Sequence, residues 1–174
     1  IGIVLTSILL FVFLHDWRQT VVAVLSMPVS VIATFMLIEM AGFTVNIMTL
    51  MALGISIGTL VTNSIVVIEN ITRHVKEGMN TYEAAEKGTA EVAVAVLAST
   101  LTNVVVFTPI AFMSGIIGRF FLQFGVTVVF ATVFSLVISF TMVPMLSARL
   151  LRAKAGGHHD ERHVWTRFTS AWDR

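Results

Sequence analysis

The sequence predicts an all-α protein, a polytopic bundle of about five transmembrane helices. Hydrophobic residues make up 56% of its 174 residues and charged residues only 12%, whereas charged residues are about a quarter of a soluble domain. The mean hydropathy is +0.91. The charges gather in short stretches, and the apolar runs between them approach the roughly 20 residues that a helix needs to cross a bilayer. A chain so poor in charge cannot present a solvated surface all round, so much of its exterior should face lipid.

The apolar runs define the predicted spans in order along the chain. They are residues 1–14, 20–40, 46–68, 91–113 and 121–146. The first is too short to cross a bilayer alone, and it has neither the basic start nor the cleavage site of a signal peptide. We therefore interpret it as the end of a helix that begins outside this chain. Asn46 is expected to cap the third span, and Pro109 and Pro144 lie near the ends of the fourth and fifth.

The polar segments between and after the spans have their own predicted structure. Residues 70–88 are expected to form a cytoplasmic helical loop, within which Asn80 and Glu83 have the spacing of a helix start. Residues 114–119 are expected to form a short loop. The membrane bundle then covers residues 1–152, and residues 153–174 form a basic tail. Aromatic and apolar residues at helical spacing in that tail suit an amphipathic helix at the membrane interface or an ordinary linker helix.

The basic residues indicate the orientation. If the spans alternate across the membrane, one side receives nearly all of them: Arg18, Arg73, Lys76, Lys87, Arg149, Arg152 and Lys154. The other side receives only Arg119. Lysine and arginine accumulate on the cytoplasmic side of membrane proteins, so residues 70–88 and the tail are expected to be cytoplasmic.

The third span carries a face of small and polar residues. Gly54 and Gly58 have the GxxxG spacing that allows close helix contact in lipid, and Thr62 and Glu69 fall on nearly the same face at 3.6 residues per turn. One interpretation is a packing seam against neighbouring helices. The other is a face that couples ion movement to transport.

Several motifs resemble one family. The segment LGISIGTLVTNSIVVIEN (residues 53–70) resembles the fourth-helix motif of the resistance–nodulation–division (RND) efflux transporters. FMSGIIGRFF (112–121) looks like that family's loop after the fifth helix, and HDWR (15–18) and GFTVN (42–46) fit the loops that flank its third helix. The likeness covers residues 1–152, and the tail more weakly resembles the cytoplasmic helix that joins the family's two membrane halves.

The resemblance implies helices two to six of the N-terminal membrane half of such a pump, without its periplasmic substrate-binding domains. It implies export of drugs, lipophilic compounds or metals, driven by a proton gradient. It also implies a homotrimer in the inner membrane of a Gram-negative cell, working with a periplasmic adaptor and an outer-membrane channel. The lipid bilayer is the remaining expected partner.

The sequence departs from the family at the coupling positions. Where the family's fourth helix usually carries one or two aspartates, this chain has Thr62 and Asn63, which cannot carry a proton. The supporting positions would be Gly54, Gly58, Glu69, Asn70, Thr100 and Asn103.

Three explanations are open. The coupling groups could lie outside this chain. The neutral oxygens of Thr62 and Asn63, with those of Asn103, Thr100 or Thr102, could hold a cation such as sodium. The protein could also be an uncoupled relative. A non-transporting membrane scaffold is the alternative function.

Other classes of function lack their motifs. The chain has no cysteine, and it has no phosphate-binding loop, zinc pattern or nucleophile–base set, so we expect no enzyme and no cofactor. His158, His159, Asp160 and His163 could bind a divalent ion, but a polar linker is the simpler interpretation, so no metal site is expected. No basic and aromatic surface indicates nucleic acid binding.

Overall fold

The computed structural model describes residues 2–14 and 16–151, and every regular element in these ranges is an α-helix. The helices are α1 (Gly2–Leu14), α2 (Trp17–Met40), α3 (Ile47–Lys76), α4 (Thr81–Ala111) and α5 (Gly115–Leu150). The predicted all-α class is confirmed. The predicted tail helix and the tail histidines lie outside the described residues.

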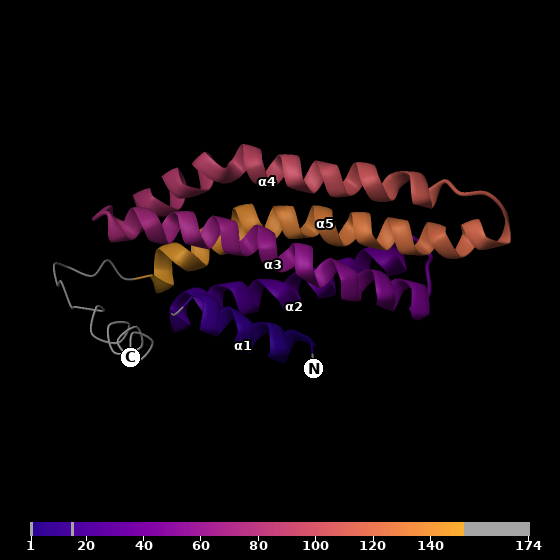
Figure 1. Cartoon of the computed structure of the whole chain (residues 1–174), viewed down its shortest axis with the longest axis horizontal. Helices are drawn as coiled ribbons and strands as arrows, with labels where there is room; N and C mark the ends of the chain where they lie inside the picture. The colour runs from indigo at the N-terminus through magenta and orange to yellow at the C-terminus, as the bar shows by residue number, and fades with distance from the viewer. Residues whose placement is uncertain (1, 15, 152–174) are drawn as a thin grey trace, which may run out of the picture.

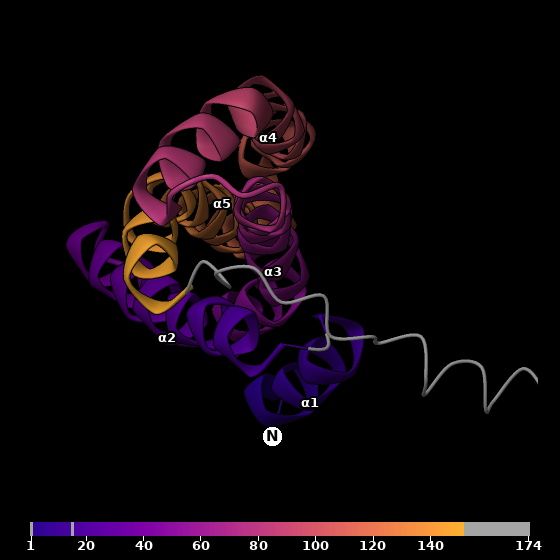
Figure 2. The same cartoon turned by 90° about the vertical axis from the view of Figure 1, so that its left-hand side faces the viewer.

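The helices lie side by side along the long axis of the molecule (Figure 1). In the end view, α5 lies among α2, α3 and α4 (Figure 2), and it packs against all three. The short helix α1 packs on α2 at the edge of the bundle. The helix α5 is therefore the centre of the bundle.

Side-chain caps fix where three of the helices begin. The Asn46 side chain accepts hydrogen bonds from the backbone N–H groups of Met48 and Thr49, and the Thr49 hydroxyl accepts one from the Asn46 N–H. The Asn46 cap is thus confirmed as a reciprocal capping box. Asp16 caps α2 and Asn80 caps α4 with one hydrogen bond each: the Asp16 side chain accepts from the Arg18 N–H, and the Asn80 side chain accepts from the Tyr82 N–H. These caps satisfy backbone donors that a helix start leaves unpaired.

The connection between α4 and α5 differs from its prediction. Residues 114–119 were expected to form a loop, but that expectation is wrong because α5 already begins at Gly115. Gly115 has a φ of 88°, which other residues rarely adopt. The Met113 carbonyl occupies the place where a side chain on Gly118 would begin. The two glycines therefore let the chain reverse and enter the helix at once.

The polar stretch 70–88 is mostly an extension of two membrane helices. The helix α3 continues to Lys76 and α4 begins at Thr81, so a turn of only residues 77–80 joins them. Charged side chains are consequently carried on helix ends, where their positions relative to one another are fixed.

The exterior of the bundle is apolar and much of its interior is small and hydroxylated. On α4, Val94 is 77% and Leu101 63% exposed, while Thr100 is buried. In the described ranges, four helices are long and apolar enough to cross a membrane, and α1 is a shorter apolar helix. Small and hydroxylated contacts between helices are typical of bundles that pack within lipid. The chain is a multi-pass membrane protein.

Candidate functional site

The neighbouring residues Thr62 and Asn63 lie on different faces of α3, because consecutive residues of a helix with 3.6 residues per turn point about 100° apart. Thr62 is exposed, and its hydroxyl donates to the Gly58 carbonyl one turn earlier at 2.9 Å. Asn63 is 5% exposed and lies inside the bundle. The two positions that the sequence pairs as one coupling site therefore differ in their surroundings: Thr62 lies on the exterior of the bundle and Asn63 in its interior.

The side chain of Asn63 joins three helices. Its Nδ2 donates to the Thr100 hydroxyl on α4 and to the Ser135 hydroxyl on α5, each at 3.4 Å. Both distances are longer than the roughly 2.7–3.2 Å of a standard N–H···O hydrogen bond, so these contacts are weak. The predicted supporting residue Thr100 thus does lie beside Asn63.

A second set of hydroxyls continues from the next residue of α3. The Ser64 hydroxyl lies 3.0 Å from the Ser26 hydroxyl of α2 and 3.5 Å from the Ser139 hydroxyl of α5. All three serines are buried. We call the buried hydroxyls and amide that meet here the polar seam; its members are Ser26, Asn63, Ser64, Thr100, Ser135 and Ser139.

The polar seam is electrically neutral. None of the acidic or basic side chains in residues 2–14 and 16–151 belongs to it, and the same part of the chain contains no cluster of metal-ligating acids and histidines. Hydroxyls and an amide can exchange hydrogen bonds, but they cannot hold and release a proton near neutral pH. The chemistry available in the seam is therefore hydrogen bonding or weak coordination of a hard cation.

The sequence did not identify the serines of the seam. Ser26 and Ser30 lie four residues apart on α2, as do Ser135 and Ser139 on α5, and this spacing places each pair on one helix face. The signal was thus present, but a serine in an apolar span can also bond its own helix. Ser30, for example, donates to the Ser26 carbonyl at 2.8 Å.

The other predicted residues near the coupling position are not brought together. Asn103 is half-buried and forms no side-chain hydrogen bond with the described part of the chain, and Thr102 is exposed and bonds the Ala98 carbonyl of its own helix at 2.8 Å. The five-residue oxygen set considered for sodium is therefore reduced to Asn63 and Thr100, with Ser135 added.

The small face of α3 is uncovered. Gly54, Gly58, Thr62 and Glu69 are all exposed. A methyl group added at either glycine would meet nothing within 4 Å among the described residues. None of the helices α1, α2, α4 and α5, as described, therefore packs against the face that the glycine spacing favours for close packing.

Asn70 belongs to a second polar group, near the end of α3 and the beginning of α4. Its Nδ2 donates to the Gly88 carbonyl at 2.7 Å and to Glu91 at 3.1 Å. Arg73 and His74 also contact Glu91, at 2.9 and 3.0 Å. We call Asn70, Arg73, His74, Gly88 and Glu91 the inner clamp. Glu69, one residue before Asn70, takes no part in it.

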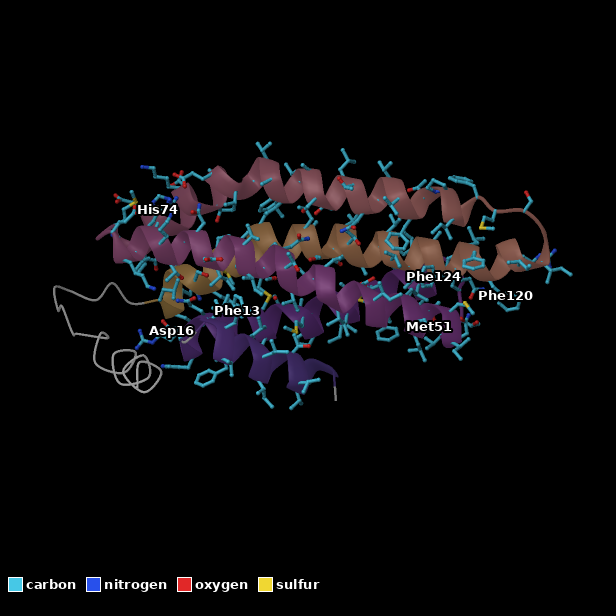
Figure 3. All side chains as sticks on the ribbon, viewed as in Figure 1. Phe13, Asp16, Met51, His74, Phe120 and Phe124 are labelled. Atoms are coloured by element: carbon cyan, nitrogen blue, oxygen red, sulfur yellow. The ribbon has the colours of Figure 1, made fainter. Side chains whose placement is uncertain are left out.

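Backbone packing accompanies the inner clamp. A Cβ on Gly88 would lie 3.0 Å from the Ile71 Cα, so α3 and α4 touch here without side chains between them. His74 is buried and lies at the end of the molecule that also carries Asp16, whereas Phe120 lies at the opposite end (Figure 3). The Arg73–Glu91 pair is half-exposed, so its share of the stability is small and the backbone contact is the firmer constraint.

Comparison with known proteins gives one consistent family. The model of the AcrB/AcrD/AcrF family matches residues 1–174. The multidrug resistance protein MdtC of Pectobacterium atrosepticum is 45% identical over 153 residues, which cover 88% of this chain and 15% of that protein. MdtC of Pantoea ananatis is 41% identical over 162 residues, covering 93% of this chain and 16% of that protein. MdtC of Escherichia coli is 41% identical over 153 residues, covering 88% and 15%. The chain thus spans about a sixth of the length of these relatives.

Proposed function

This chain belongs to the AcrB/AcrD/AcrF family of RND transporters, and from that premise we propose that it is part of the membrane domain of an ion-driven efflux transporter. The family is one of transporters, not enzymes. The relatives are named multidrug resistance proteins, so drugs and other lipophilic compounds are the proposed substrates. Residues 1–152 would form the membrane bundle, residues 70–88 its cytoplasmic connection and residues 153–174 a cytoplasmic tail.

The proposal extends to the setting of the whole protein. It places the transporter as a homotrimer in the bacterial inner membrane, working with a periplasmic adaptor and an outer-membrane channel. The family membership supports this setting, and so does the apolar exterior of the bundle.

The neutrality of the polar seam carries the mechanistic part of the proposal. Asn63 is held by two hydroxyls, Thr62 bonds its own helix, and no acid or base of the described residues joins them. We therefore assign the proton-carrying groups to parts of the protein outside the residues described. The uncovered face of α3, with Thr62 and the two glycines, is the side on which such groups would approach.

Proton-driven efflux in proteoliposomes tests this function. The intact protein is reconstituted, a pH gradient is imposed without sodium, and efflux of a fluorescent lipophilic drug is followed. We expect the native protein to pump. We expect Thr62→Asp not to increase the rate of proton-driven efflux, because the proton-carrying groups lie elsewhere in the protein.

The Thr102→Asp variant is the matched control. Thr102 is exposed, and its hydroxyl donates to the carbonyl four residues earlier, as the Thr62 hydroxyl does. Thr102→Asp therefore measures how much any added exposed carboxylate changes the efflux rate. A native protein that is silent until Thr62→Asp is introduced would contradict the proposed coupling and favour an uncoupled scaffold. Efflux that requires sodium would favour a cation site at Asn63, Thr100 and Ser135.

A further inference from the structure

A groove of about 550 Å³ lies between the first turns of α4 and the last turns of α5. Its main lining residues are Tyr82, Glu86, Ala90, Phe140, Pro144 and Arg149. It is separate from the polar seam and from the inner clamp, with which it shares no residue.

The lining changes from polar to apolar along the helix axis. Tyr82 is the second residue of α4 and Arg149 the last but one of α5, so both lie at the end of the bundle. Phe140 precedes Arg149 by nine residues, which places it about 13 Å deeper along the axis at 1.5 Å per residue. A phospholipid has the same order, with a polar headgroup at the membrane surface and acyl chains below it.

The mouth of the groove carries two opposite charges that are not paired with each other. The ion pairs of the described residues involve Arg73, His74, Glu77 and Glu91. Glu86 and Arg149 form none within that part of the chain, although both line this groove. A carboxylate and a guanidinium that line one groove without forming an ion pair complement a ligand that itself carries both charges.

We propose that this groove binds one phospholipid with a primary ammonium headgroup, namely phosphatidylethanolamine. Its phosphate accepts hydrogen bonds from Arg149 and from the Tyr82 hydroxyl, because guanidinium groups match phosphate oxygens. Its ammonium donates to Glu86, and one acyl chain lies along Phe140 and Pro144. Phosphatidylcholine has no N–H to donate to Glu86, and phosphatidylglycerol has no cation at all.

This inference does not rest on ion coupling or on transport. It requires only that the end of the bundle where α4 begins and α5 ends lies at a membrane surface. The gathering of basic residues near that end supports this position.

Lipid binding by native mass spectrometry tests the proposal. The intact protein in detergent is titrated separately with phosphatidylethanolamine, phosphatidylcholine and phosphatidylglycerol of identical acyl chains. We expect about a three- to fivefold preference for phosphatidylethanolamine, the size expected for one exposed charge pair. Glu86→Gln should abolish that preference and leave phosphate binding in place. Arg149→Gln should weaken the binding of all three lipids.

Two further variants complete the design. Lys87→Gln changes the neighbouring exposed charge, which does not line the groove, and should leave the preference unchanged. Ala90→Phe places a ring in the groove from an exposed position. It should weaken the binding of all three lipids without changing any charged residue.

Three results would overturn the proposal. Equal binding of the three lipids by the native protein would show that the bound lipid is only nonspecific annular lipid. A preference that survives Glu86→Gln would place the headgroup elsewhere. Absence of bound lipid from the native protein would show that another part of the polypeptide covers the groove.

Discussion

At the scale of single residues, burial separates two adjacent positions that the sequence presents as a pair. Thr62 satisfies its hydroxyl within its own helix and faces outward. Asn63 is buried and depends on Thr100 and Ser135 for hydrogen bonds. Substitutions at the two positions should therefore act on different properties, stability at Asn63 and contacts outside this chain at Thr62.

We predict that Asn63→Ala lowers the free energy of unfolding by about 1–2 kcal/mol, because it removes two interhelical bonds of roughly 0.6 kcal/mol each and leaves a small void. Unfolding of the intact protein in detergent measures this loss. The control is Asn103→Ala, since Asn103 is half-buried and makes no side-chain bond to the described residues. Equal losses in the two variants would show that Asn63 has no special structural role.

At the scale of helices, the glycines of α3 and α4 have different surroundings. Gly88 touches the backbone of Ile71 within the inner clamp, whereas Gly54 and Gly58 face open space within the described part of the chain. Glycine thus allows a close backbone contact between α3 and α4 at Gly88. At Gly54 and Gly58 it leaves a surface of α3 that the described residues do not cover.

We predict that Gly88→Ala destabilises the protein by about 1–3 kcal/mol, since the added methyl group pushes against backbone atoms that cannot rotate away. The shift in thermal unfolding temperature of the intact protein reports it. Gly58→Ala is the control, because its added methyl group meets no described atom within 4 Å and should leave the stability unchanged. A comparable loss from Gly58→Ala would show that the uncovered face of α3 packs closely on another part of the protein. A neutral Gly88→Ala would contradict the contact between α3 and α4.

At the scale of the whole molecule, the distribution of charge determines the proposed orientation. The turn between α3 and α4 and the turn between α4 and α5 lie at opposite ends of the bundle (Figure 1). The first is flanked by many basic and acidic side chains, and the second only by Arg119. One end should therefore face the cytoplasm and the other the periplasm.

Cysteine labelling measures that orientation, and this chain contributes no cysteine of its own. In an intact protein freed of other cysteines, we predict that Ser114→Cys reacts with an impermeant maleimide in spheroplasts. Lys87→Cys should react only after the inner membrane is opened. Both positions are exposed in the described chain, so the two variants are matched in access. Labelling of Lys87→Cys before the inner membrane is opened would show that the orientation is the opposite of the one proposed.

Features that depend on neighbouring residues in the sequence could be predicted, and those that depend on contacts between helices could not. The all-α class follows from composition, and the Asn46 cap follows from residues within one turn. The partners of Asn63 lie 37 and 72 residues away, and spacing along one helix cannot identify them. The start of α5 was missed because two glycines were interpreted as a loop, when one permits a tight reversal and the other a close backbone contact.

We propose that the polar seam packs the bundle and does not carry the driving ion. The most direct measurement is the rate of proton-driven efflux by the intact protein with Thr62→Val and Asn63→Leu combined, which remove every polar atom from both side chains and keep their approximate size. Because we assign the proton to groups outside the described residues, we expect the folded double variant to keep at least about half of the native rate, with a small loss from weaker packing. Loss of the proton-driven rate, with substrate binding and thermal stability retained, would show that Thr62 and Asn63 form the coupling site after all.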